Sequence, residues 1–415
     1  MTDNRPHLTL FSAAPVVVVD EGHLRIDDKF VAGMDMHARH WDGPITAVVC
    51  AGKASDLPFS SVYPIDELGF RVKVLPEGAA PETALEKGPG LVLASADMTE
   101  QLALGDAAKA LGLSVVYGIE YTLDTRMRIA MIDKRRGYLR RLWSVVWNYR
   151  QERRRKQVLR QADGIQMNGF PAASEYSALN SYALRYLDNR MQKPMFATTR
   201  DMVARQRHHE AAGPLRLIHS GRLEPLKGAH LLLPLAELLV ARGVPFTLAI
   251  YGDGSLAEGM RAQIAQKGLG KHVSLHGPLP FESGLVPVSR MEADLFISCH
   301  VQSDPSCTYL EAMGCGLPVL GFDNQMLSPL VLHSNGGWTV PMNQLRQMAE
   351  QIGALAKDRK QLLDHAEAAL TYARRHDAES EFEARMAHLA RVFKQTDRSD
   401  LTFAATPSAL DLAKS

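Results

Sequence analysis

The chain has 415 residues, which is enough for two domains of ordinary size, and 46% of them are hydrophobic, as in a globular protein. Its 47 Lys and Arg residues nearly balance its 46 Asp and Glu residues, so the net charge of +1 provides no overall attraction for nucleic acid. The four cysteines form no CxxC pair, which argues against a disulfide framework and a zinc site.

The first half alternates between apolar strands and amphipathic helices. Strands are predicted at residues 7–11, 45–50, 91–94 and 114–117, a loop at 12–20, and helices at 27–40 and 99–111. This alternation predicts a doubly wound parallel sheet. The half contains no G-x-G-x-x-G sequence, which argues against a nicotinamide enzyme.

Residues 126–160 differ from the rest of the first half because they are helical in character and dense in Lys and Arg. Trp143, Trp147 and Tyr149 lie among the cations, and the two tryptophans, four residues apart, share one face of a helix. A solvated charged helix and a nucleic-acid contact are the alternatives. We favour an anionic membrane surface as the partner, because cations and aromatic rings together suit lipid headgroups.

The start of the chain is polar and leads directly into the first strand, which predicts no signal peptide. No apolar run reaches the ~18–20 residues that span a bilayer. We therefore expect a cytoplasmic protein, which is peripheral on the inner face of the cytoplasmic membrane if residues 126–160 dock there.

The second half repeats the alternation of strands and helices. A strand at 162–167, a helix at 172–184 and an irregular linker at 195–213 precede it. Strands are then predicted at 215–219, 246–251, 273–276, 295–298 and 318–322, and helices at 229–242, 256–266 and 282–291. Further helices run from 343 to a last one at 379–394, and the polar tail over 396–415 is expected to be disordered. A second doubly wound sheet is therefore predicted.

A loop with two cations follows the strand at 215–219. It reads His-Ser-Gly-Arg-Leu-Glu-Pro-Leu-Lys-Gly over residues 219–228 and precedes a helix. Gly221 allows a sharp turn, and Arg222 and Lys227 direct positive charge to the same place. Two cations there can stabilise the negative charge of a phosphate group. A cation pair that only closes a helix start is the weaker alternative, because a helix N-terminus disfavours cations.

A second loop joins the strands at 295–298 and 318–322. Its helix begins near Ser306, Cys307 and Thr308, where free backbone N–H groups and the helix dipole suit a phosphate. Glu311 follows within the first turn, where it can accept hydrogen bonds from paired sugar hydroxyls. Ligands of a parallel sheet bind beyond the carboxyl ends of its strands, so this loop lies where a site is expected.

The two loops resemble the large retaining family of GT-B glycosyltransferases that build bacterial polysaccharides and lipopolysaccharides, the family 4-like enzymes or glycosyl transferases group 1. The family's Gly-Arg-Leu-x-x-x-Lys-Gly sequence matches residues 221–228, and its Glu-Ala-Met-Ala-x-Gly-x-Pro-Val sequence is closely similar to residues 311–319. An earlier Glu of the family motif is replaced by Ser303, with Asp304 beside it. The resemblance implies an α/β, GT-B fold of two doubly wound Rossmann-like domains that face each other across a cleft.

The same resemblance implies the domains and their roles. Residues 1–205 would form an acceptor-binding domain, residues 206–377 a nucleotide-sugar-binding domain, and a helix at about 378–395 would cross back to the first domain.

The resemblance also implies the roles of individual residues. Donor contacts are expected from Gly221, Gly252, Asp253, His276, Ser303, Asp304, Ser306, Cys307, Thr308 and Glu311. Among them, Glu311 would bind the ribose, and Ser303 or Asp304 would contact the donor sugar. Catalytic roles are expected for Arg222, Lys227, Asp97 and Glu120. Asp97 would face the donor sugar and Glu120 the acceptor hydroxyl, with solvated loop carboxylates as the alternative for both.

The expected function is transfer of a sugar, with retention of configuration, from a nucleoside diphosphate sugar to a hydroxyl group. UDP and GDP are the expected nucleotides, and the acceptor would be a glycan or a lipid-linked glycan of the bacterial surface. No cofactor, metal ion or nucleic acid is expected to take part. The alternatives are a GT-B nucleotide-sugar epimerase and a degenerate GT-B scaffold or binding protein.

Overall fold

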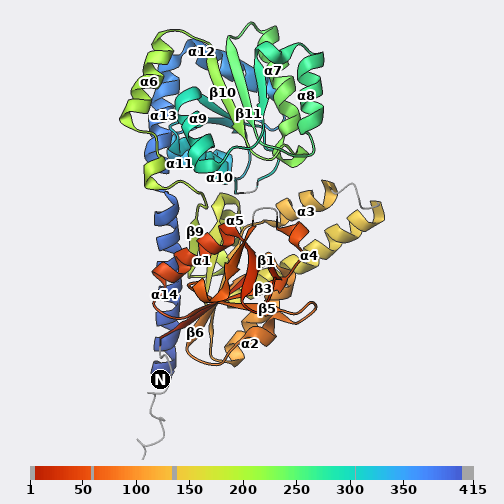
Figure 1. Cartoon of the computed structure of the whole chain (residues 1–415), viewed down its shortest axis with the longest axis vertical. Coiled ribbons are helices and arrows are strands. Elements are labelled where there is room, and N and C mark those ends of the chain that lie inside the picture. Colours follow the sequence, from red (N-terminus) through yellow and green to blue (C-terminus); the bar gives the residue numbers. More distant parts are fainter. Residues whose placement is uncertain (1–4, 58–59, 133–137, 304, 404–415) are drawn as a thin grey trace, which may run out of the picture. The chain divides into compact units, whose positions relative to one another are not determined.

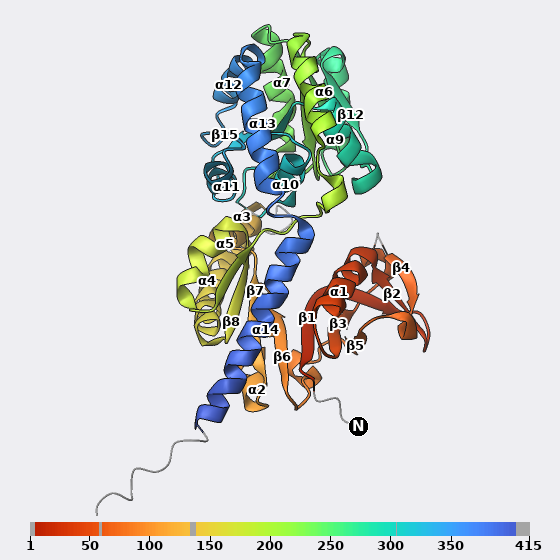
Figure 2. The same cartoon turned by 90° about the vertical axis from the view of Figure 1, so that its left-hand side faces the viewer.

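The computed structural model describes residues 5–57, 60–132, 138–303 and 305–403. The chain divides into two compact units, each built around its own sheet (Figure 1 and Figure 2). Unit 1 comprises Met1–Asn168, Ala172–Tyr186 and Phe382–Ser415, and unit 2 comprises Gly169–Pro171 and Leu187–Glu381. Unit 2 is therefore inserted into the sequence of unit 1.

The sheet of unit 1 has nine strands within the described residues. They are β1 (His7–Val18), β2 (His23–Asp27), β3 (Ile45–Ala51), β4 (Ser60–Pro64), β5 (Arg71–Leu75), β6 (Gly90–Ser95), β7 (Ser114–Ile119), β8 (Gly164–Asn168) and β9 (Ala183–Tyr186). Parallel pairing gives the order β5-β3-β1-β6-β7-β8-β9, and β2 and β4 extend β1 in antiparallel fashion.

Strand β1 is longer than the sequence predicted. The loop expected at residues 12–20 is wrong for most of its length, because the strand continues to Val18. The register of β1 against β3 shifts between Phe11 and Pro15, so the strand bends there without ending. The valines beyond this irregularity have high strand propensity, and Val17 pairs with Arg25 of β2.

Helices cover both faces of the unit 1 sheet. They are α1 (Asp28–His40), α2 (Leu104–Ala110), α3 (Leu123–Ile132), α4 (Tyr138–Gln161), α5 (Gly169–Tyr176) and α14 (Ala378–Phe403). Leu91 and Leu93 of β6 belong to a core shared with α1 and α14, whereas Val92 and Ala94 belong to one shared with α2 and α5. Alternate residues of one strand thus serve opposite faces, as a doubly wound sheet requires.

Unit 2 has a six-stranded, wholly parallel sheet in the order β12-β11-β10-β13-β14-β15 within the described residues. The strands are β10 (Leu215–Ser220), β11 (Phe246–Tyr251), β12 (Val273–His276), β13 (Leu295–Ser298), β14 (Val319–Phe322) and β15 (Gly337–Val340). The helices are α6 (Thr199–Glu210), α7 (Leu232–Ala241), α8 (Ala257–Gln266), α9 (Val286–Glu292), α10 (Cys307–Gly314), α11 (Leu327–Ser334), α12 (Leu345–Lys357) and α13 (Arg359–Ala373). One core joins the sheet to α7, α8 and α12, and another joins it to α9, α10, α11 and α13. Both predicted doubly wound sheets are confirmed.

Three predictions of local structure are wrong. The irregular linker expected at 195–213 contains α6, which begins with a capping box between Thr198 and Asp201. The helix expected at 172–184 ends at Tyr176, and Ala183–Tyr186 is strand β9. Helix α14 runs to Phe403, past residue 396, where a disordered tail was expected to begin.

The compact units divide after Tyr186, whereas the boundary expected at 205/206 falls inside α6.

Candidate active site

The loop after β10, residues 219–228, is here called the cation loop, and it is fixed against the loop after β11. The N–H of Gly221 donates to the carbonyl oxygen of Tyr251 at 3.1 Å. Gly252 has a φ of +140°, and a Cβ atom there would lie 2.0 Å from the carbonyl oxygen of Gly221. Only glycine fits such an approach. The cation loop therefore has a defined path at the carboxyl edge of the unit 2 sheet.

Arg222 and Lys227 are the charged groups of the cation loop. Arg222 is exposed and Lys227 is half-buried. At the end of the loop, Gly228 has a φ of +67°, and a Cβ atom there would lie 1.7 Å from the carbonyl oxygen of Cys299. The cation loop thus touches the chain that leaves β13 toward α10. The two cations and the start of α10 lie at the same edge of the sheet, because both follow the carboxyl ends of the neighbouring parallel strands β10 and β13.

Two buried imidazoles lie close to Lys227. His219 and His300 are at most 2% exposed, and burial, followed by the charge of Lys227, lowers the pKa of each below its ordinary value. His300 Nδ1 lies 3.2 Å from the hydroxyl oxygen of Tyr309 on α10. Both imidazoles are therefore neutral at pH 7 and add no charge of their own beneath the cation loop.

Helix α10 begins at Cys307, with Ser306 as its N-cap residue. The hydroxyl oxygens of Ser306 and Thr308 lie 2.5 Å apart. Ser303, 6% exposed, accepts a hydrogen bond at 3.2 Å from the N–H of Gln325, so its hydroxyl connects the loop before α10 to the loop after β14. Asp304 lies outside the described residues.

The outer strands of the sheet carry two further predicted donor residues. Asp253 is exposed and accepts a hydrogen bond from the N–H of Gly254 at 2.8 Å. His276 is exposed and stacks on Tyr251, with ring centroids 4.7 Å apart and planes inclined by 13°. Both residues lie at the carboxyl ends of their strands, where the sequence predicted them.

Glu311 is occupied by a partner that the sequence did not reveal. Arg190 Nε donates to Oε1 of Glu311 at 2.7 Å, and an Arg190 NH2 group donates to Oε2 at 2.9 Å. The Arg190 guanidinium also lies 3.9 Å above the ring of Phe281. No motif or periodicity marks Arg190, which lies 121 positions before Glu311 in the chain.

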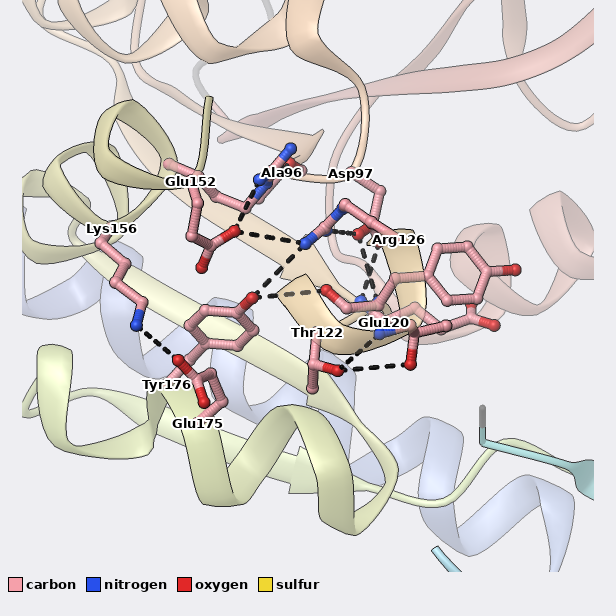
Figure 3. Close-up of polar contacts among 12 residues, drawn as sticks. Ala96, Asp97, Glu120, Thr122, Arg126, Glu152, Lys156, Glu175 and Tyr176 are labelled. Atoms are coloured by element: carbon pink, nitrogen blue, oxygen red, sulfur yellow. Dashed lines mark hydrogen bonds and ion pairs between the residues drawn. The ribbon is translucent and has the colours of Figure 1, made fainter. Parts of the chain in front are cut away.

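In unit 1, Asp97 and Arg126 belong to a network of buried charges (Figure 3). Arg126 ion-pairs with Asp97 and lies 3.5 Å from Glu152. Arg155 pairs with the same Glu152 at 2.8 Å and donates to the carbonyl oxygen of Ala96 at 2.6 Å. The network connects α3 and α4 to the loop that follows β6.

The carboxylate of Asp97 also supports the loop after β7. It accepts backbone hydrogen bonds from the N–H of Glu120 at 2.8 Å and of Tyr121 at 3.2 Å. Both oxygens of Asp97 are thereby engaged within the protein, and they fix the backbone that carries Glu120. The structure gives Asp97 a positioning role, and its predicted contact with the donor sugar stays a prediction.

A pocket of about 590 Å³ lies in unit 1 beside residues 11–13, in the middle of β1, and beside the carboxyl ends of β3 and β5. Phe11, Val48 and Leu75 contribute buried apolar surface, and the irregularity in β1 forms one wall. The charged side chains that line it are the carboxylates Glu77, Glu82 and Glu100, with no Lys, Arg or His among the lining residues of the described chain. Such a pocket suits an uncharged ligand better than a phosphate.

Helix α4 presents an exposed aromatic and basic surface. Trp143 is 68% exposed, Trp147 41% and Tyr149 55%, and Arg153 and Arg154 are exposed nearby. Arg155, another cation of the segment 126–160, is not part of this surface, because it is 1% exposed and pairs with Glu152. Asp133, Lys134, Arg135 and Arg136 lie outside the described residues. Within the described chain, every helix is too short or too polar to span a membrane.

Comparison with known sequences finds a match between residues 203–375 and the family model described as "Glycosyl transferases group 1". The chain is 30% identical over 152 residues to the putative colanic acid biosynthesis glycosyltransferase WcaL of Escherichia coli K12. That match covers 35% of this chain and 37% of WcaL, so the chain spans well under half the length of this curated relative.

Comparison with solved structures finds similarity over nearly the whole chain. Anabaena HepE, solved in complex with UDP, superposes with a TM-score of 0.61 at 14% identity, over 96% of this chain and 100% of HepE. WaaG, described as a glycosyltransferase involved in lipopolysaccharide biosynthesis, superposes with a TM-score of 0.57 at 14% identity, over 91% and 98%. These similarities establish the fold.

Proposed function

We propose that this chain transfers a sugar from a nucleoside diphosphate sugar to a hydroxyl acceptor. The proposal is supported by its GT-B fold and by the match of residues 203–375 to the family model described as "Glycosyl transferases group 1". The observation that carries the proposal is the meeting of the cation loop with the chain that leads to α10. Arg222, Lys227 and the N–H groups of α10 are gathered at one sheet edge. Such an edge suits a diphosphate.

The demanding step in this reaction is departure of the diphosphate, which gains negative charge as the bond to the sugar breaks. Arg222 and Lys227 would stabilise that charge, and the buried imidazoles below remain neutral and do not compete. The acceptor hydroxyl would lose its proton to the departing phosphate oxygen as the new bond forms on the same face of the sugar. Retention of configuration follows from this geometry, and no metal ion or cofactor is required by the proposal.

We propose a UDP-sugar as the first donor to examine, with a GDP-sugar as the second. HepE, which shares the fold, was solved with UDP, and this supports UDP without assigning it here. Glu311 would bind the ribose hydroxyls, and Ser303 would help shape the space for the donor sugar. Exposed His276 and the ring of Tyr251 would provide a surface beside the base.

We propose a glycan of the bacterial cell surface as the acceptor, in line with the colanic acid and lipopolysaccharide roles that the names of WcaL and WaaG give. The acidic, largely apolar pocket of unit 1 would hold an uncharged part of it, and Glu120 would contact the reacting hydroxyl. If the acceptor is lipid-linked, the exposed aromatic and basic surface of α4 would hold the enzyme at the inner face of the membrane.

The test has two stages. Thermal unfolding with UDP, GDP, ADP and CMP identifies the nucleotide, because a ligand at ~100 times its dissociation constant stabilises a protein by ~2.7 kcal/mol. The matching nucleotide sugar is then incubated with and without a bacterial glycan extract. A transferase releases the nucleotide and labels the glycan. An epimerase changes the sugar without the extract, and a scaffold shows no turnover, so either result would overturn the proposal.

A further inference from the structure

The two side chains of the Arg190–Glu311 ion pair differ strongly in their exposure to solvent. The side chain of Glu311 is 5% exposed, whereas that of Arg190 is 44% exposed. Glu311 lies within α10, and Arg190 lies on the segment that leads from β9 to α6. The carboxylate is thus fixed in a buried position, and the guanidinium covers it from the solvent side.

The contact leaves the carboxylate without an accessible acceptor position. A guanidinium fork uses one lone pair of each carboxylate oxygen, and both Glu311 oxygens are engaged at 2.7 and 2.9 Å. The remaining lone pairs belong to a side chain that is almost fully buried. Two ribose hydroxyls therefore cannot reach Glu311 from solvent while Arg190 remains in this position.

Arg190 is held but not enclosed. Its guanidinium lies 3.9 Å over the ring of Phe281, the first residue of the helical turn Phe281–Leu285 that follows β12. Burial opposes the charge of Arg190, but its hydrogen bonds to Glu311 and the charge of Glu311 prevail, so the pKa of Arg190 is raised. The cation therefore persists at any working pH, and its exposed part allows it to turn into water.

We propose that Arg190 is a gate on the nucleotide site, and that its ion pair with Glu311 must open before a ribose can bind. The inference rests on the proposed function, in which Glu311 receives the ribose. In this proposal Arg190 competes with the ribose for the Glu311 carboxylate and does not itself bind the nucleotide. Opening exchanges the two hydrogen bonds from Arg190 to Glu311 for two from ribose hydroxyls. The ion pair therefore sets part of the nucleotide's affinity and of its rate of association.

The test is calorimetry and stopped-flow binding of the nucleoside diphosphate that stabilises the parent protein. An ion pair whose cation is partly exposed contributes about 1 kcal/mol, so Arg190→Ala should tighten binding about five-fold and accelerate association by a similar factor. Arg190→Lys keeps a cation but loses the fork, and it should give a smaller gain in both quantities.

Two controls separate gating from other effects. Arg242→Ala removes another partly exposed ion pair of unit 2, formed with Glu350 at 2.7 Å, and should leave nucleotide binding unchanged. Glu311→Gln should weaken binding, and adding Arg190→Ala to it should bring no further gain, because the gate acts only through Glu311.

The outcomes are distinct. Weaker or unchanged binding by folded Arg190→Ala overturns the gate, and weaker binding would make Arg190 a ligand of the nucleotide. If Arg190→Ala does not fold, Arg190→Lys decides, since an affinity and association rate equal to those of the parent would also overturn the gate. A parent protein that binds none of UDP, GDP, ADP and CMP refutes the proposed function itself, which is a separate result.

Discussion

At the scale of single residues, Arg222 and Lys227 offer the most direct test of the proposed chemistry. Both lie on the cation loop, where they are exposed or half-buried, so neither supports a core. Arg222→Ala and Lys227→Ala should each lower kcat by about 10²–10³, as removal of one transition-state donor does elsewhere, with little change in unfolding temperature. Lys267→Ala, which removes a surface ion pair with Glu237, is the matched control. Near-parental turnover in folded variants would remove both cations from the mechanism.

Asp97 should matter for stability as well as for activity. Its side chain is 18% exposed and that of its partner Arg126 is 9% exposed. Asp97→Ala leaves the Arg126 cation with the more distant carboxylate of Glu152 and the hydroxyl of Tyr176, and loss of a buried charged partner costs about 3 kcal/mol. Urea unfolding of unit 1 should show this loss, and the altered backbone at Glu120 should lower kcat.

A second ion pair on α3, the helix that carries Arg126, provides the control for Asp97→Ala. Asp124 ion-pairs with Arg128 at 2.8 Å, but both side chains are nearly half exposed. Asp124→Ala should therefore cost less than about 1 kcal/mol. Equal losses for Asp97→Ala and Asp124→Ala would contradict a buried network.

At this scale the sequence predicted which residues belong to the site, but not which other residues they contact. Arg222 and Glu311 were found because each lies in a short motif at a strand end. Arg190 was missed because its partner lies 121 residues away and nothing local distinguishes it. Asp97 was selected because it follows a strand where the resembled family often has a His or Asp, yet its ion pair with Arg126 depends on how α3 packs, which local sequence does not encode.

At the scale of elements, α4 is expected to bind anionic membranes. The parent protein should sediment with vesicles that contain anionic lipid at low salt and should be released at high salt, because each engaged Lys or Arg contributes ~1 kcal/mol near such a surface. Arg153→Glu/Arg154→Glu and Trp143→Ala/Trp147→Ala should each reduce binding. Arg155 is excluded from the test, because it supports the fold from inside.

The control for membrane binding comes from a basic surface without exposed tryptophan. Arg207→Glu on α6 changes an exposed charge in the other unit and should leave sedimentation unchanged. A parent protein that stays in the supernatant at low salt would end the membrane proposal and leave α4 as a solvated surface.

The elements also show where patterns of hydrophobicity succeed and where they fail. The central strands were predicted well because continuous apolar runs are typical of strands buried on both faces. Helix α6 was missed because its most buried side chains are Arg205 and His209, so its buried face is not apolar. Arg205 donates instead to backbone carbonyl oxygens at the end of α9 and of α10. Strands β2 and β9 were missed because both are short and carry mixed side chains, and β9 is an edge strand of the sheet.

At the scale of the whole molecule, both units should lose stability as pH falls below neutrality. His37 in unit 1 is buried, and burial, with a smaller effect from Arg385, lowers its pKa from 6.5 to about 4. The pKa of His219 and His300 in unit 2 is lowered for the same leading reason. In the unfolded chain these histidines bind protons below about pH 6.5, whereas in the folded units they bind protons only at lower pH. Stability is therefore complete above that pH and declines between pH 6.5 and 4.

For His37 alone, the decline amounts to about 3 kcal/mol by pH 4. Unfolding temperature measured from pH 7.5 to 4.5 should fall steadily, and His37→Leu should make the decline shallower. His230→Leu, at an exposed position, is the control and should reproduce the parental curve. A parental unfolding temperature that stays constant over this range would show that these imidazoles are protonated in the folded protein.

The place of α14 in the chain has a consequence for the order in which the protein matures on the ribosome. Phe382, Met386, Leu389 and Val392 complete a core of unit 1 whose other members lie before residue 117. Leu187–Glu381 of unit 2 is synthesised in between. Nascent chains usually fold from the N-terminus, but here the synthesis of unit 1 begins first and its core is completed last. Chains arrested before Phe382 should therefore yield a protease-resistant unit 2 and a degraded unit 1, whereas arrest beyond Phe403 should protect both.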